Sequence, residues 1–152
     1  MNPKDIVHAF ATRTRANLKV INALKSADLE VFEVTQLVNS LLGLLIFPQQ
    51  RYYQSIPKIA LSELAQSGWP KPLVVGEFPA VKNLKELMRY LRNAIAHFNV
   101  EYLSDESGEI RGMRLWNINR NKEKDWVVEL SLRDVEVAVD KFSDLIVPDA
   151  SA

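Results

Sequence analysis

The chain has no cysteine, so its 152 residues can form neither a disulfide nor a thiolate metal site. It has only two histidines, His8 and His97, which stand far apart without a carboxylate cluster beside them. Such a set makes a poor metal site. A glycine-rich phosphate loop is also missing. We therefore expect no metal and no other cofactor.

Long apolar runs are missing as well. The most apolar run, Leu41–Phe47, is too short to cross a bilayer. The first ten residues carry an acid and lack the apolar centre of a signal peptide. These features predict a cytoplasmic protein that does not interact with a membrane.

The chain also lacks an excess of positive or negative charge, because 19 basic residues balance 19 acidic ones. A protein that coats long nucleic acid is usually basic, so any contact with nucleic acid here must be local. Basic residues do cluster in two places. Residues 13–25 carry basic side chains and no acid, and residues 82–92 carry four basic side chains against Glu86 alone.

The length and an apolar content of 47% predict one domain with a substantial core. Apolar spacing predicts four main helices, over about residues 2–24, 29–47, 82–99 and 131–147. Ser131 and Asp134 approximate a capping box at the start of the fourth helix. Alternating, β-branched and aromatic sequence at about 100–130 predicts two or three short antiparallel strands.

The predicted fold is mainly α: a four-helix bundle with a small antiparallel β insert between the third and fourth main helices. Residues 1–148 would form this single domain, and residues 149–152 a disordered tail. The proline-containing stretch between the second and third helices should be irregular, with a short helix near 58–66.

Two features of this layout have alternative explanations. Gln36, Asn39, Ser40 and Gly43 form a small, polar stripe on the second helix, which either admits a neighbouring helix closely or lines a polar site. Packing is the favoured explanation. Trp116 and Trp126 either anchor a partner or pack the strands onto the bundle, and packing is again favoured.

The third helix combines a core face with a polar face. Its apolar stripe consists of Leu84, Leu87, Met88, Leu91, Ile95 and Phe98. Glu86, Tyr90, Asn93 and His97 lie on the far side. Asn93 and His97 are one turn apart, whereas Arg92 lies roughly 140° around the helix from His97. A compact site would therefore draw its groups from two helices.

The polar face carries groups suited to phosphate chemistry. A histidine can change its charge state near neutral pH, as acid–base catalysis requires. An arginine beside it can bind a phosphate bidentately. Arg92, Asn93 and His97 are the candidate catalytic residues, and further candidates for RNA binding are Arg89, Lys85, Asn39 and Arg51. The competing explanation is a merely solvated helix face.

The stretch "RNAIAH", with Arg92, Asn93 and His97, resembles the Arg-x4-His signature of the HEPN superfamily. "LVNSLLGLLIFPQQRYY" is similar to segments of prokaryotic HEPN-family nucleases. The resemblance implies a helical bundle that forms homodimers, with two motifs facing one cleft. It further implies a metal-independent endoribonuclease of a defence or toxin–antitoxin system, with RNA as substrate and an antitoxin or other regulatory protein as a further partner. Asn99 replaces a tyrosine that toxins paired with nucleotidyltransferases often carry, so regulation through that tyrosine is not expected.

In this interpretation His97 acts as general acid or base, Arg92 holds the scissile phosphate and Asn93 orients one of them. Two other functions stay open. One is a non-catalytic HEPN module that binds RNA or a nucleotide. The other is a protein-interaction module, such as an antitoxin or scaffold.

Overall fold

The computed structural model describes residues 3–25, 33–46, 53–78 and 81–146, so Arg51 and the tail at 149–152 lie outside the described residues. The helices are α1 (Pro3–Lys25), α2 (Glu33–Ile46), α4 (Leu84–Ala96) and α5 (Leu132–Ile146), with short 3₁₀ turns η1 (Tyr53–Ser55) and η2 (Leu61–Glu63). The strands are β1 (Leu73–Val74), β2 (Val100–Ser104), β3 (Ile110–Ile118) and β4 (Lys124–Ser131). None of the described helices is long and apolar enough to cross a membrane.

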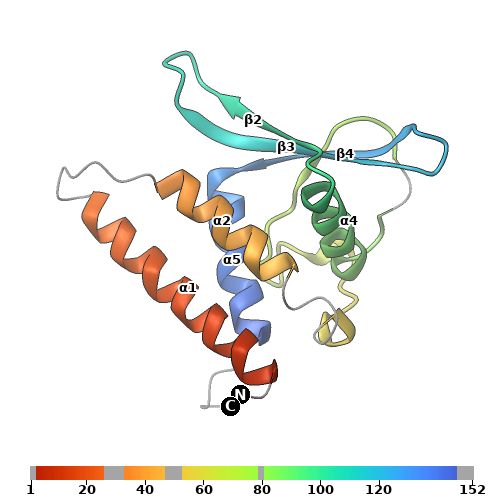
Figure 1. Ribbon diagram of the computed structural model, residues 1–152. Helices are drawn as coiled ribbons and strands as arrows, with labels where there is room; N and C mark the ends of the chain where they lie inside the picture. The colour runs from red at the N-terminus through yellow and green to blue at the C-terminus, as the bar shows by residue number, and fades with distance from the viewer. Residues whose placement is uncertain (1–2, 26–32, 47–52, 79–80, 147–152) are drawn as a thin grey trace.

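The prediction of a mainly α bundle with a small β insert is wrong, because the fold is mixed. The strands form one four-stranded antiparallel sheet in the order β1-β4-β3-β2. β1 precedes α4 in sequence, so the sheet is not confined to the segment between the third and fourth main helices. The sheet forms a layer of its own above the helices (Figure 1).

The sheet is a layer because one of its faces is apolar. Side chains at alternate positions of β3 and β4 point toward the helices and are at most 3% exposed: Met113, Leu115, Trp126, Val128 and Leu130. They share one core with the buried faces of α2, α4 and α5. An antiparallel sheet with one apolar face must bury that face, and here it supplies one side of the core.

The small stripe on α2 serves helix packing, as favoured from the sequence. A Cβ atom at Gly43 would collide with the ring of Phe10, so glycine lets this ring of α1 pack against α2. Ser40 is 2% exposed, and its hydroxyl donates to the carbonyl of Gln36 at 2.8 Å. Asn39, by contrast, is exposed.

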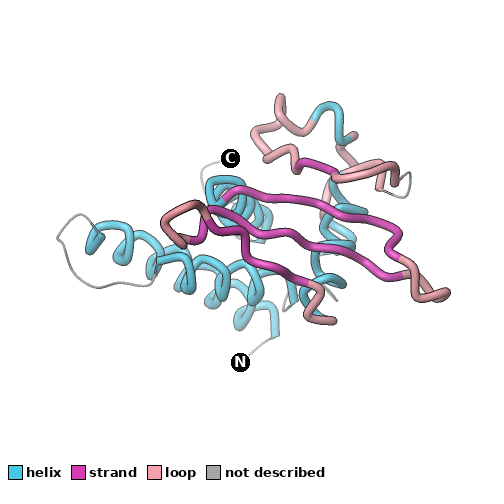
Figure 2. Tube along the Cα trace, turned by 90° about the horizontal axis from the view of Figure 1, so that it is seen from above, coloured by secondary structure: helices cyan, strands magenta, loops and turns pink. Residues whose placement is uncertain are grey.

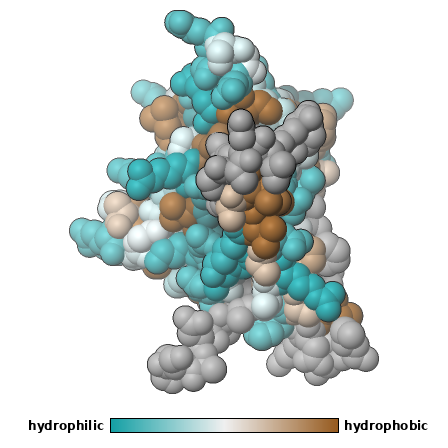
Figure 3. Space-filling view, turned by 90° about the vertical axis from the view of Figure 1, so that its left-hand side faces the viewer, coloured by the Kyte–Doolittle hydropathy of each residue, from teal (hydrophilic) through white to brown (hydrophobic). Residues whose placement is uncertain are grey.

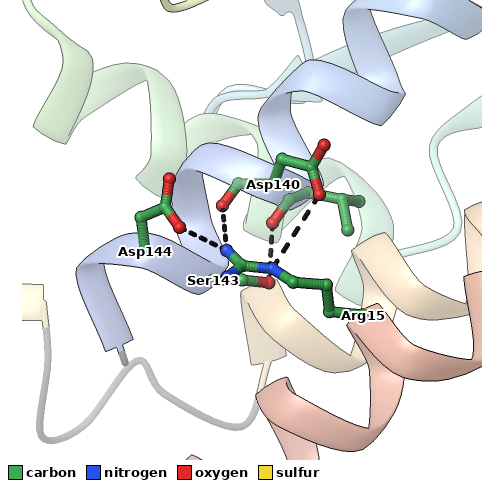
Figure 4. A network of polar contacts seen from close by, with 5 residues as sticks. Arg15, Asp140, Ser143 and Asp144 are labelled. Carbon is green, nitrogen blue, oxygen red and sulfur yellow. Dashed lines mark hydrogen bonds and ion pairs between the residues drawn. The ribbon is translucent and has the colours of Figure 1, made fainter. Parts of the chain in front are cut away.

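A polar contact joins the first and last helices (Figure 4). The Arg15 guanidinium donates to the carbonyl oxygen of Asp140 at 3.0 Å and forms an ion pair with the Asp144 carboxylate. Ser143 lies beside this contact, and its hydroxyl donates to the carbonyl of Val139 at 2.8 Å. One cation of the basic run at 13–25 is thus engaged in holding α1 against α5.

Candidate functional site

The start of α4 is fixed by a reciprocal cap. The Asn83 carboxamide oxygen accepts from the backbone N–H of Glu86 at 3.0 Å. The Glu86 carboxylate in turn accepts from the backbone N–H of Lys82 at 2.8 Å. The first bond satisfies an N–H group of the first turn that the helix leaves without a partner, and the second ties the residue before the cap to the helix. Five of the six residues predicted for the apolar stripe are buried: Leu84, Leu87, Met88, Leu91 and Ile95.

The sixth residue of that stripe, Phe98, is not buried. The helix ends at Ala96, and Phe98 has a φ of +57° and is 86% exposed. The Asn99 N–H donates back to the Ala94 carbonyl at 2.8 Å, the bond that closes a Schellman-type helix end. The prediction for Phe98 is wrong because the chain has already left the helical period there.

Two of the three candidate catalytic side chains meet. A guanidinium nitrogen of Arg92, Nη1, donates to the Asn93 carboxamide oxygen at 2.7 Å. His97 is exposed, caps the end of α4 and donates its backbone N–H to the Asn93 carbonyl at 3.0 Å. Its imidazole forms no hydrogen bond or ion pair within the described part of the chain. One protomer therefore joins Arg92 to Asn93 but leaves the His97 imidazole apart.

Contacts with the sheet hold α4 in place. Packing of Trp126 onto the helices was favoured from the sequence, whereas the roles of Asn117 and Tyr90 were not predicted. The Asn117 side chain donates to the Tyr90 carbonyl at 2.8 Å, and the Tyr90 ring packs edge-on against Trp126 with centroids 5.5 Å apart. Burial raises the pKa of Tyr90, and the Asp125 carboxylate raises it further. An asparagine in phase with Met113 and Leu115 was the available signal, because a buried polar side chain needs a partner.

The residues predicted to bind RNA do not gather into one site. The Lys85 ammonium donates to the Gln54 side chain at 2.9 Å and lies 4.7 Å from the ring centroid of Tyr53. Arg89 is exposed, with its guanidinium 5.5 Å from the ring centroid of Tyr90. Asn39 is on α2, and Arg51 lies outside the described residues. Lys85 and Arg89 share α4 with the motif, whereas Asn39 does not.

The hollows on the described surface include one that is apolar and one that lies on the sheet. An apolar one of about 90 Å³ lies between α2, the end of α4 and β2, and is lined by Val38, Leu41, Leu42, Ile95, Phe98, Val100, Tyr102 and Met113. A larger one of about 240 Å³ lies on the sheet around Gly112. Neither is lined by Arg92, Asn93 or His97, although the smaller one includes Phe98, the next residue after His97.

The site thus consists of a capped helix that is held against a sheet and carries arginine, asparagine and histidine at its end. The chain belongs to a family of HEPN-domain proteins, which confirms the predicted membership in the HEPN superfamily. The family model that matches it, over residues 1–151, is HEPN pEK499 p136. No curated protein and no solved structure matches the chain. Membership in this family indicates a nuclease or nucleotide-binding module.

Proposed function

We propose that the protein is a homodimeric, metal-independent endoribonuclease that cleaves RNA through its own 2′-hydroxyl. The observation that carries the proposal is the Arg92–Asn93 hydrogen bond of 2.7 Å, one turn before an exposed histidine on a capped helix. RNA carries its own nucleophile, so the enzyme has to position the strand, move protons and stabilise charge.

The 2′-oxygen attacks the adjacent phosphorus, and the bond from phosphorus to the 5′-oxygen breaks. His97 takes the 2′-proton or protonates the departing 5′-oxygen, and water accepts or supplies the other proton. Arg92 binds the non-bridging phosphate oxygens, and its planar fork stabilises the charge that they gain in the transition state. Asn93 holds the Arg92 guanidinium in place. The products are a 2′,3′-cyclic phosphate and a 5′-hydroxyl.

A second copy of the chain would complete the site. Phe98 is 86% exposed beside the apolar hollow, and Tyr102 at the same hollow is 49% exposed. Covering these side chains with a partner protomer removes apolar surface from water and brings two α4 ends together. His97 of one copy could then reach the phosphate held by Arg92 of the other. Light scattering should give twice the mass of the chain at micromolar concentration, and an active monomer would contradict the composite site.

The cellular context is part of the proposal. We place the ribonuclease in the cytoplasm, in a defence or toxin–antitoxin system with an antitoxin or other regulatory protein as partner. The second candidate is a non-catalytic module that binds RNA or a nucleotide. It is favoured by the separation of the His97 imidazole from the Arg92–Asn93 pair within one protomer.

The test is incubation of the purified protein with mixed RNA, with and without EDTA, followed by identification of the product ends. We expect cleavage in both samples and 2′,3′-cyclic phosphate ends, with His97→Ala as the matched control for contaminating nucleases. Cleavage that EDTA abolishes and a divalent ion restores would exclude this mechanism. RNA binding without cleavage would favour the non-catalytic module.

A further inference from the structure

The face of β2, β3 and β4 that points away from the helices is open. Figure 2 looks onto this face, and none of the described chain lies over it. Because Met113, Leu115 and Asn117 point toward the helices, Arg114 and Trp116 point outward. Near the middle of the face, Arg114 is compensated by the carboxylates of Glu129 at 2.9 Å and Glu101 at 3.1 Å.

The two hairpin ends of the sheet carry opposite charge. The β2–β3 turn at 105–109 holds three acids, Asp105, Glu106 and Glu109, and no base. The β3–β4 turn, residues 119–123, holds the bases Arg120 and Lys122 and one acid, and β4 then begins with Lys124 and Asp125. The hairpins project from opposite ends of the sheet (Figure 2), and the acidic one forms part of the hydrophilic top of the view in Figure 3. A polyanion is therefore attracted to the β3–β4 end and repelled from the other.

The basic end also offers an aromatic ring. Trp116 is partly exposed, unlike Trp126, which is 1% exposed. The Lys124 ammonium lies 4.6 Å from the centroid of the Trp116 ring, so a lysine side chain covers one face of that ring. The backbone N–H of Trp116 donates to the carbonyl of Asn99 at 3.2 Å. The strand that carries the ring is therefore bonded to the chain two residues beyond His97.

We propose that Trp116, Arg120, Lys122 and Lys124 form a site for single-stranded RNA, called here the hairpin site. A base stacks on the Trp116 ring, and the three cations contact the phosphates on either side. The hairpin site leads the strand past the end of α4 toward His97. This inference rests on the proposed function, in which RNA is the substrate.

The strengths of the two interactions favour an RNA base over the Lys124 ammonium that now covers the Trp116 ring. Stacking of a base on an aromatic side chain strengthens binding by a factor of roughly 5 to 150. An exposed cation–π contact contributes a factor of only roughly 2 to 5. A base can thus displace the Lys124 ammonium, which then becomes free to reach a phosphate. The local excess of positive charge selects a nucleic acid over an apolar protein surface as the occupant.

The experiment measures binding separately from cleavage. A fluorescently labelled RNA of about 12 nucleotides, within the range of known single-strand site sizes, carries 2′-O-methyl sugars so that it cannot be cut. Anisotropy titrations compare the parent protein with Trp116→Leu, which keeps an apolar side chain in the strand, and Trp116→Phe, which keeps a ring. We expect a loss of affinity of roughly 5- to 150-fold for Trp116→Leu, largely restored in Trp116→Phe.

A second pair of variants tests the cations without touching the core. Arg120→Gln with Lys122→Gln should weaken binding and reduce the salt dependence, log K against log salt, by a slope of about 1.4. Arg111→Gln with Arg133→Gln is the matched control, because it removes the same charge from exposed residues near the acidic end. Circular dichroism confirms that each variant is folded.

The outcomes separate this inference from the ribonuclease proposal. Parent binding with unchanged affinity in the Trp116→Leu and hairpin-turn variants overturns the hairpin site and leaves the ribonuclease proposal standing. Loss of affinity in these variants, together with no cleavage of ordinary RNA by the parent, supports the hairpin site and contradicts the ribonuclease. A parent that does not bind RNA overturns both.

Discussion

At the scale of single residues, Phe98 combines a left-handed backbone conformation with an exposed aromatic ring. It has a φ of +57°, a conformation that side chains with a Cβ atom disfavour by roughly 1–2 kcal/mol, and it buries little surface in return. Glycine loses more conformational entropy on folding than other residues do, which costs roughly 0.5–1 kcal/mol. The relief of steric strain at residue 98 should outweigh this entropic cost.

We therefore predict that Phe98→Gly raises the free energy of unfolding of the monomer by up to about 1 kcal/mol. Urea unfolding at low protein concentration measures the change. Phe98→Ala is the control, because it removes the ring but keeps the Cβ atom and should not stabilise. Equal effects of the two variants would show that the backbone conformation is not the cause.

The different chemical roles proposed for His97 and Arg92 give a second prediction at the scale of single residues. His97→Ala should lower the chemical rate by roughly 10²–10⁴-fold and leave RNA affinity nearly intact, since it removes a proton-transfer group. Arg92→Ala should lower both, and Arg92→Lys should restore little, because a point charge cannot replace the planar fork. Single-turnover rates and affinities at matched salt measure the two effects. A His97→Ala variant as fast as the parent would refute the assigned role.

At the scale of elements, we expect the contact between α4 and the sheet to weaken at high pH through Tyr90. Its pKa is raised in the folded protein, first by burial and then by Asp125, so the folded state holds the phenolic proton more tightly than the unfolded chain does. The associated stability is fully present below the ordinary tyrosine pKa of about 10 and is lost as the pH rises through the raised value.

We expect the free energy of unfolding to fall as the pH rises above about 10. Tyr90→Phe should reduce that fall, because it removes the phenolic proton. Urea unfolding at several alkaline pH values measures the slope. Tyr102→Phe is the control, because Tyr102 is 49% exposed on an edge strand. If both variants keep the parent slope, Tyr90 is not the group that responds.

At the scale of the whole molecule, the sheet and the helices form one cooperative unit because they share one core. Leu115 on β3 and Leu91 on α4 are 0% and 2% exposed, and both belong to that core. Truncation of either residue to alanine should cost roughly 2–5 kcal/mol.

The measurable consequence is a single unfolding transition, seen at the same denaturant midpoint by every probe. In Leu115→Ala, the helical signal in far-ultraviolet circular dichroism and the tryptophan fluorescence should shift to the same lower denaturant midpoint. Ile118→Ala is the control, since Ile118 is 49% exposed at the end of the same strand. Helices that keep the parent midpoint while the fluorescence transition shifts would indicate a separable β insert.

The sequence by itself determined the features that depend on local spacing. It predicted all four main helices, the Ser131–Asp134 capping box and five of the six buried positions on α4. It also predicted the packing role of Ser40 and Gly43. These features follow from the helical period and from hydrogen bonds within a few residues. Residues close together in the sequence are therefore enough to recognise them.

Only the tertiary structure decided which strands make up the sheet and which of its faces is buried. β1 has two residues, too few to show a period, and it exists because β4 offers it an edge. Strand alternation separates the two faces but does not say which one is covered, so Trp116 and Trp126 looked equivalent in sequence. The helices cover the face that bears Trp126 and leave Trp116 open. The fate of a side chain in a sheet depends on what packs against each face, and distant segments supply that layer.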